Sequence, residues 1–175
     1  MLHKTALQGT TMEVTAGRAF TPRLSESEKL VGIGFRSWMA GYQTGDISCW
    51  EFAWATYENV LGPKKAKPVL TDLACWVRAI RDASCRSIEV YPAQCAGLCR
   101  DECMAISMVA ASQHNACPAI RACAFALLES STIDAVVDGA MSLGATLKGC
   151  DRILSATAIC DAMALAHVQT SGRKH

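Results

Sequence analysis

The residues with the most evident chemistry are three cysteines spaced four residues apart, Cys95, Cys99 and Cys103. On an α-helix, residues at this spacing are neighbours, with Cβ atoms about 5–6 Å apart. The three thiols would therefore form one stripe along a helix face. Thiolates at such a spacing can share a soft ion such as Cu(I), or can bind Zn²⁺ together with ligands from another helix. The stripe is a candidate metal site or thiol redox site.

A tetrahedral site needs further ligands from elsewhere in the chain. The possible thiol donors on other segments are Cys75, Cys85, Cys117 and Cys123. His114 follows Cys103 by eleven residues, which is about 16 Å along a continuous helix and too far for one ion. No CxxC pair occurs in the sequence, which argues against a zinc ribbon, a thioredoxin-type dithiol and a c-type haem site. Copper(I) or zinc held between helices is the cofactor that this pattern suggests.

The same cysteines have a second interpretation, in which no cofactor is bound. A cysteine without a disulfide is among the most buried residue types and packs as a small hydrophobe. In this interpretation the cysteines fill a helical core, and Arg100, Asp101 and Glu102 between them form the polar face of the helix. Glu102 falls nearest the stripe. Both interpretations remain open at this point.

The segment CAGLCRDEC, residues 95–103, is followed by an apolar stretch that contains Met104 and Met108. Over residues 95–125 it resembles one helix of the cysteine-lined four-helix bundles that store copper. This resemblance implies thiols that face a common lumen from several helices. The N-terminal part of the chain offers tryptophans and only Cys49, so the resemblance implies at most a small site.

Composition and charge exclude several classes of protein. The chain of 175 residues has 17 basic and 16 acidic side chains, and this balance gives no electrostatic basis for binding nucleic acid. It has no uncharged apolar window of about 18 residues, so we expect no membrane span. The first residues lack the apolar run of a secretory signal. We therefore expect a cytoplasmic protein with reduced thiols, which starts at Met1 or at Met12.

The elements that must position the cysteines are helices, because aromatic residues make up only 6% of the chain and apolar residues recur at helical spacing. We expect an all-α, single-domain irregular helical bundle of about six to seven helices. A helical hairpin over 25–61 opens it, with Ser25 and Asp46 as N-caps. A stripe in its second helix should be buried: Ile47, Trp50, Trp54, Tyr57 and Leu61.

Further helices follow the hairpin. A third should start at Pro68 or Thr71, a fourth should cover 93–113 and carry the cysteine stripe, and a fifth should cover 119–128. A sixth should follow Thr132, and a last one should run from Cys150 to Val168. We expect the domain to cover 25–169, between a flexible arm at 1–24 and a disordered tail at 170–175.

No enzyme template fits this sequence. It lacks HExxH, a Glu-x-x-His pair, a P-loop and GxGxxG. The function that we predict is therefore that of a non-enzymatic protein-interaction or regulatory module, which binds a protein partner or forms a homo-oligomer. The alternative is soft-metal binding or thiol redox sensing through Cys95, Cys99 and Cys103.

Overall fold

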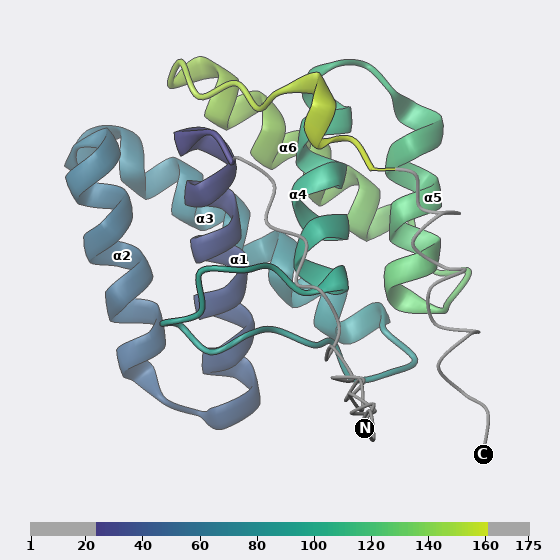
Figure 1. The fold of residues 1–175 in the computed structure, drawn as a ribbon, viewed down its shortest axis with the longest axis horizontal. Coiled ribbons are helices and arrows are strands. Elements are labelled where there is room, and N and C mark those ends of the chain that lie inside the picture. The colour runs from purple at the N-terminus through teal and green to yellow at the C-terminus, as the bar shows by residue number, and fades with distance from the viewer. Residues whose placement is uncertain (1–23, 161–175) are drawn as a thin grey trace, which may run out of the picture.

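The computed structural model describes residues 24–160, and within this range it contains helices and no strand (Figure 1). This confirms the predicted all-α, single-domain helical bundle. A single 3₁₀ turn, η1, follows six α-helices. The helices are α1 (Glu26–Thr44), α2 (Ile47–Leu61), α3 (Pro63–Ala83), α4 (Arg100–Gln113), α5 (Cys117–Leu128) and α6 (Asp134–Gly149), and η1 is Ala156–Ala158.

The predicted caps of the first two helices are confirmed. The Glu28 N–H donates to the Ser25 hydroxyl at 3.3 Å, and the Ser25 N–H donates to the Glu28 carboxylate at 2.8 Å. This reciprocal pair satisfies two backbone donors that a helix start leaves open. Asp46 accepts from the Ser48 N–H at 2.9 Å at the start of α2. Gly45 ends α1 with a φ of 71°, a left-handed conformation that glycine adopts without steric cost.

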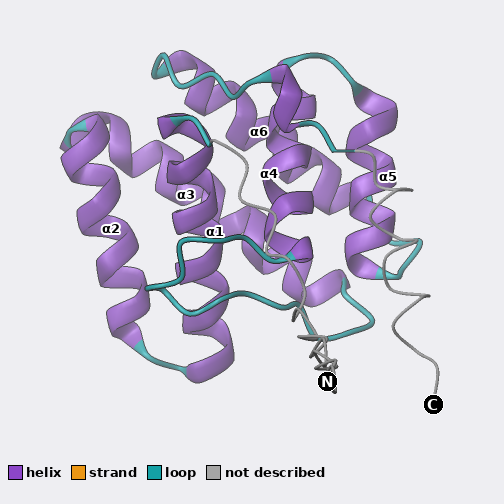
Figure 2. Cartoon of the chain, in the orientation of Figure 1, coloured by secondary structure: helices purple, strands orange, loops and turns teal. Residues whose placement is uncertain are grey.

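Four helices form a closed ring of contacts. The other two lie at opposite edges of the bundle, α2 at the left and α5 at the right of Figure 2. In the ring, α1 packs on α3, α3 on α6, α6 on α4, and α4 on α1. Outside it, α2 packs across α1 and α3, whereas α5 packs across α4 and α6. The predicted helical hairpin is confirmed, and it packs on α3 through both of its helices and on α4 through α1.

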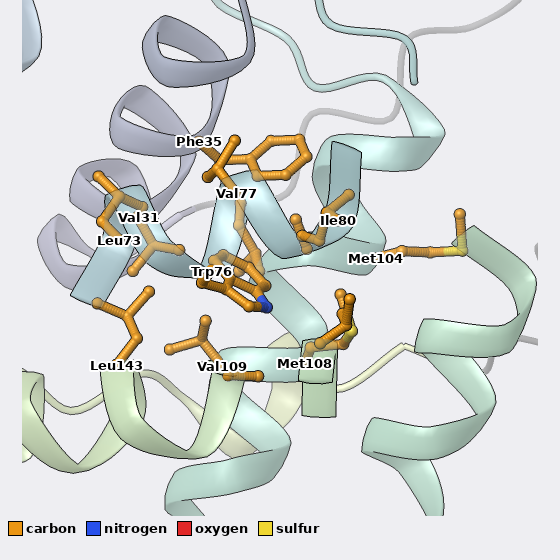
Figure 3. Close-up of a cluster of buried hydrophobic side chains, with 14 of the residues drawn as sticks. Val31, Phe35, Leu73, Trp76, Val77, Ile80, Met104, Met108, Val109 and Leu143 are labelled. Carbon is orange, nitrogen blue, oxygen red and sulfur yellow. The ribbon is translucent and has the colours of Figure 1, made fainter. Parts of the chain in front are cut away.

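Trp76 of α3 fills the centre of the ring and is completely buried. Figure 3 shows it surrounded by side chains from all four ring helices, among them Phe35, Val77, Met108 and Leu143. The Phe35 and Trp76 rings lie 5.8 Å apart, centroid to centroid. Gly139 of α6 lies directly against Trp76, because a Cβ at this glycine would come within 2.8 Å of the indole ring. The buried side of α3 is thus the centre of the core.

The third helix starts earlier than predicted, at Pro63. Proline suits the first turn of a helix, where its missing N–H leaves no hydrogen bond unmade. Pro68 was expected at or near the helix start but lies inside α3. Pro68 has no N–H, so the Lys64 carbonyl four residues earlier receives no helical hydrogen bond. Both residues are exposed, so water can solvate this carbonyl instead. Burial of Ala66 and Val69 accounts for the additional turn.

The predicted helix over 93–113 is wrong in its first part. Residues 84–99 form a long loop, and α4 begins at Arg100. Cys99 has extended backbone angles of −81° and 172° and serves as the N-cap of α4. The prediction, which relied on Pro92 and the cysteine spacing, therefore placed the start of this helix about two turns too early.

The predicted helix from Cys150 to Val168 is also wrong over its described part. After Gly149 the chain turns at Asp151, which has a φ of 60°, and 150–160 continues as a strap with only the short turn η1. The Leu154 N–H donates to the Gln113 side chain at 2.8 Å, and the Ser155 N–H donates to Glu28 at 2.9 Å. The strap therefore crosses from the end of α4 to the start of α1. Residues 161–168, the tail at 170–175, and the arm at 1–24 except Leu24 lie outside the described residues.

Candidate functional site

The loop over 84–99 is held in place by Arg36 of α1. Its guanidinium forms a bidentate ion pair with Glu102 of α4, whose side chain is fully buried. Its other hydrogen bonds go to three loop carbonyls: Cys95 at 2.7 Å, Gly97 at 2.7 Å and Pro92 at 3.3 Å. Burial acts to lower the pKa of Arg36, but the hydrogen bond and charge of Glu102 outweigh it and raise that pKa. All donors of this guanidinium are therefore engaged within the protein.

A second ion pair fixes the other half of the loop. Arg86 donates to both carboxylate oxygens of Asp101, at 2.8 and 2.6 Å, and Asp101 also accepts from the Glu89 N–H at 2.8 Å. Asp101 is buried. Two carboxylates at the N-terminus of α4 also interact favourably with the helix dipole. The prediction that Asp101 and Glu102 form a solvated polar face is wrong: they anchor the loop inside the protein.

The three predicted site cysteines do not share a helix face. Cys95 lies in the loop and is half-buried, Cys99 caps α4 and is buried, and only Cys103 lies within α4. The Cys99 Sγ donates to the Glu89 carbonyl at 3.1 Å, and the Cys99 N–H donates to Glu102 at 2.8 Å. Cys99 is therefore part of the loop anchor.

The surroundings of Cys99 and Cys103 favour the protonated thiol over the thiolate. Burial raises the pKa of Cys99 to about 12, and the Glu102 charge adds to the rise. Burial also raises the pKa of Cys103 to about 11, with further contributions from Cys160 and Glu102. Because the thiolate is the nucleophile and the metal ligand, these shifts disfavour both kinds of chemistry at neutral pH.

The other proposed thiol donors are dispersed. Cys75, Cys85 and Cys117 are exposed, and Cys123 is buried in α5 with its Sγ 3.4 Å from the Ser107 hydroxyl. Among residues 24–160, no group of three or more Cys, His, Asp or Glu side chains lies in a position to hold a metal ion. The common lumen that the resemblance to copper-storing bundles implies is not formed in this part of the chain.

A hollow of about 570 Å³ separates α1 from the loop, and Cys95 lines it together with Lys29, Ile33, Arg36 and Leu98. The two charged side chains in its wall, Arg36 and Lys29, already have partners. Arg36 donates all its hydrogen bonds within the protein, and Lys29 pairs with Glu26 at 2.7 Å. The hollow therefore offers no cation that lacks a partner to recognise a ligand.

The surface of α2 is where the structure departs furthest from the expected burial. Only Ala53 and Tyr57 of its fifteen residues are buried. Ile47 is 62% exposed and Trp54 is 41% exposed, although both belong to the stripe that was predicted to be buried. Phe52 and Val60 on other sides of the helix are exposed as well. The prediction that Trp54 lies in the core is therefore wrong.

Two other tryptophans connect this exposed edge to α1. Trp50 and Trp38 are both half-buried, and their ring centroids are 6.4 Å apart. The Trp50 indole N–H donates to the Trp38 carbonyl at 3.2 Å, and the Tyr42 ring packs edge-on against Trp50 at 5.6 Å. The α1–α2 seam is thus aromatic, and these contacts fix the packing of α2 against α1.

None of the helices in 24–160 is long and apolar enough to cross a bilayer. No protein-family model, curated protein or solved structure matches this chain.

Proposed function

We propose that this chain is a non-enzymatic protein-interaction module that binds its partner through the exposed edge of α2. The observation that carries the proposal is the exposure of Ile47 and Trp54 on one flank of this helix. Single exposed apolar side chains are common on protein surfaces. Here, however, seven large hydrophobic side chains are exposed in the described residues, and four of them lie on α2 (Ile47, Phe52, Trp54 and Val60). Two of these four, Ile47 and Trp54, share one flank of the helix, and this pairing supports the proposal.

The type of residue supports the same proposal. Tryptophan is enriched among the side chains that contribute most to protein–protein binding, because it buries a large rigid surface. Trp54 follows Trp50 by one helical turn, and Trp50 is fixed by its hydrogen bond to Trp38. The helix that presents Trp54 is therefore held against α1 before a partner binds, which lowers the entropic cost of binding.

Position-specific photo-crosslinking in the native cell tests the proposal. A photoreactive phenylalanine analogue is placed at position 47 or 54 on α2, or at position 125 on α5 as the matched control. Phe125 is exposed to a similar degree, 58%, but has no exposed apolar neighbour on its helix of the size seen on α2. We expect the same protein adduct from positions 47 and 54 and not from 125. Equal adducts from all three positions, or none from α2, would contradict the proposal.

A further inference from the structure

We infer that the partner docks a basic amphipathic helix along α2, with apolar and cationic side chains alternating on its contact face. This inference rests on the proposed function and adds the chemistry of the partner to it.

The first support is the pattern along the exposed flank of α2. Ile47, Glu51, Trp54 and Glu58 follow one another at spacings of four, three and four residues. At 100° per residue these four positions fall within about 60° of the helix circumference, and they span about 16 Å along its axis. They form one line in which apolar and acidic side chains alternate. We call these four residues the α2 stripe.

The second support is the charge of α2 itself, although the Arg152 guanidinium donates to the Val60 carbonyl at the C-terminal end of this helix. The whole chain is nearly neutral, but residues 46–62 contain Asp46, Glu51 and Glu58 and no lysine or arginine. Asp46 is engaged as the cap of α2. Seven other carboxylates form ion pairs in the structure, whereas none of the ion pairs within 24–160 involves Glu51 or Glu58. The two acids of the stripe are therefore available to cations of a partner.

Charge complementarity selects this partner over the alternatives. Nucleic acid and anionic lipid surfaces would be repelled by the two carboxylates beside Trp54. A second copy of the stripe would bring like charges together, which disfavours a symmetric pairing of α2 with α2. A helix with lysine or arginine opposite Glu51 and Glu58 complements both carboxylates at the spacing of the stripe. Its apolar side chains would cover Ile47 and Trp54.

The test uses two labelled, helix-stapled peptides and fluorescence anisotropy. One peptide alternates leucine and lysine at spacings of four, three and four residues, and the other has glutamate in place of lysine. We expect the lysine peptide to bind the full chain about tenfold more tightly than the glutamate peptide, since two peripheral ion pairs contribute this order of affinity. The preference should decrease as salt is raised.

Three variants distinguish this inference from the proposed function. E51K/E58K should reverse the peptide preference, whereas E89K/D138K, with the same change in net charge at exposed acids elsewhere, should leave it unchanged. W54A should weaken both peptides. If W54A weakens binding but E51K/E58K does not reverse the preference, the inference fails and the proposed function stands. If W54A has no effect on either peptide, or neutral lipid vesicles bind to Trp54 in place of the peptides, both fail. Circular dichroism of each variant confirms the fold.

Discussion

Arg36 shows how much one side chain organises in this protein. Its guanidinium lies on α1, pairs with Glu102 on α4, and holds carbonyls of a loop that has no helix or strand of its own. Arginine suits this role because its planar fork donates in several fixed directions at once. The loop over 84–99 therefore depends on a residue about fifty positions earlier in the chain.

Replacing Arg36 by methionine should lower the free energy of unfolding by about 3–5 kcal/mol, because it leaves Glu102 charged and buried without its partner. The double variant R36M/E102L should recover only part of this loss, since the loop carbonyls still lack a donor. Urea unfolding followed by tryptophan fluorescence measures both. As a control, K29M breaks an exposed pair and should cost less than about 1 kcal/mol. Full recovery in the double variant would show that the loop does not depend on Arg36.

Cys99 is the residue at which the soft-metal prediction can be tested. Its thiol is protonated and donates to the Glu89 carbonyl, so we expect Zn²⁺ or Cu(I) to change the melting temperature of C99S and of the unaltered chain by the same amount. C99S itself should cost about 1–3 kcal/mol through burial of a hydroxyl. If metal at a hundredfold excess over Kd stabilises only the unaltered chain, by about 2.7 kcal/mol, Cys99 is a ligand and the metal function is correct.

At the scale of the elements, α1 and α2 meet through two glycines. A Cβ at Gly34 would overlap the Tyr57 ring and Leu73, and a Cβ at Gly41 would overlap the Trp50 indole. The two glycines are seven residues apart and so lie on one side of α1. From the sequence, glycine within a helix only weakens the prediction of that helix. In the structure, Gly34 and Gly41 let α2 approach α1 closely.

Tyr57 and Trp54 should respond very differently to truncation. Tyr57 is fully buried and its hydroxyl donates to the Leu30 carbonyl at 2.9 Å. Tyr57→Ala should therefore cost about 3–5 kcal/mol, the range for emptying a large aromatic site. Trp54→Ala should cost less than about 1 kcal/mol, because half-exposed side chains contribute little to stability. Thermal melts of both variants measure this difference, and a loss above 3 kcal/mol for W54A would place Trp54 in the core after all.

The first two helices were predictable from local signals, but the orientation of α2 was not. Caps at Ser25 and Asp46 and the apolar spacing in α2 were read correctly from the sequence. Helical periodicity shows which side chains lie on the same face of a helix. It does not show which face packs against the neighbouring helices. Ala53 and Tyr57 face the core, so the stripe is rotated and Ile47 and Trp54 face outward. No aromatic pattern in the sequence distinguishes these two outcomes.

At the scale of the whole molecule, the two segments that were wrongly predicted as helix are held by interactions between residues far apart in the sequence. The loop over 84–99 is stabilised by Arg36 and Glu102, which are 66 residues apart. Glu28 accepts locally from the Ser25 N–H at the start of α1 and also from the Ser155 N–H across 127 residues. Local propensity contains no information on such pairs. The cysteine site was predicted from spacing on a helix that does not exist at Cys95 and Cys99, and the exposed stripe of α2 could only be seen once the helices were packed.

Two thiols and one phenol hydroxyl with raised pKa values should make the free energy of unfolding depend on pH in the alkaline range. Burial raises the pKa of Cys99 from 9.0 to about 12 and of Cys103 from 9.0 to about 11, and it also raises the pKa of Tyr57. The unfolded chain therefore releases these protons at lower pH than the folded chain. The free energy of unfolding should be unaffected below pH 9 and should fall between pH 9 and about 12. Urea midpoints at pH 8 and pH 11 measure the fall, which should be smaller in C99A/C103A. An equal fall in that variant would assign it to other groups.

The strap over 150–160 has a consequence for biosynthesis. Because the first helix of the described chain receives part of its anchoring from Ser155, a ribosome must add residues well beyond α6 before the start of α1 has all its hydrogen bonds. Contacts between residues so far apart in sequence form late and slow folding. The nascent chain therefore exposes the apolar sides of its early helices during translation, which is the period when it most depends on chaperones.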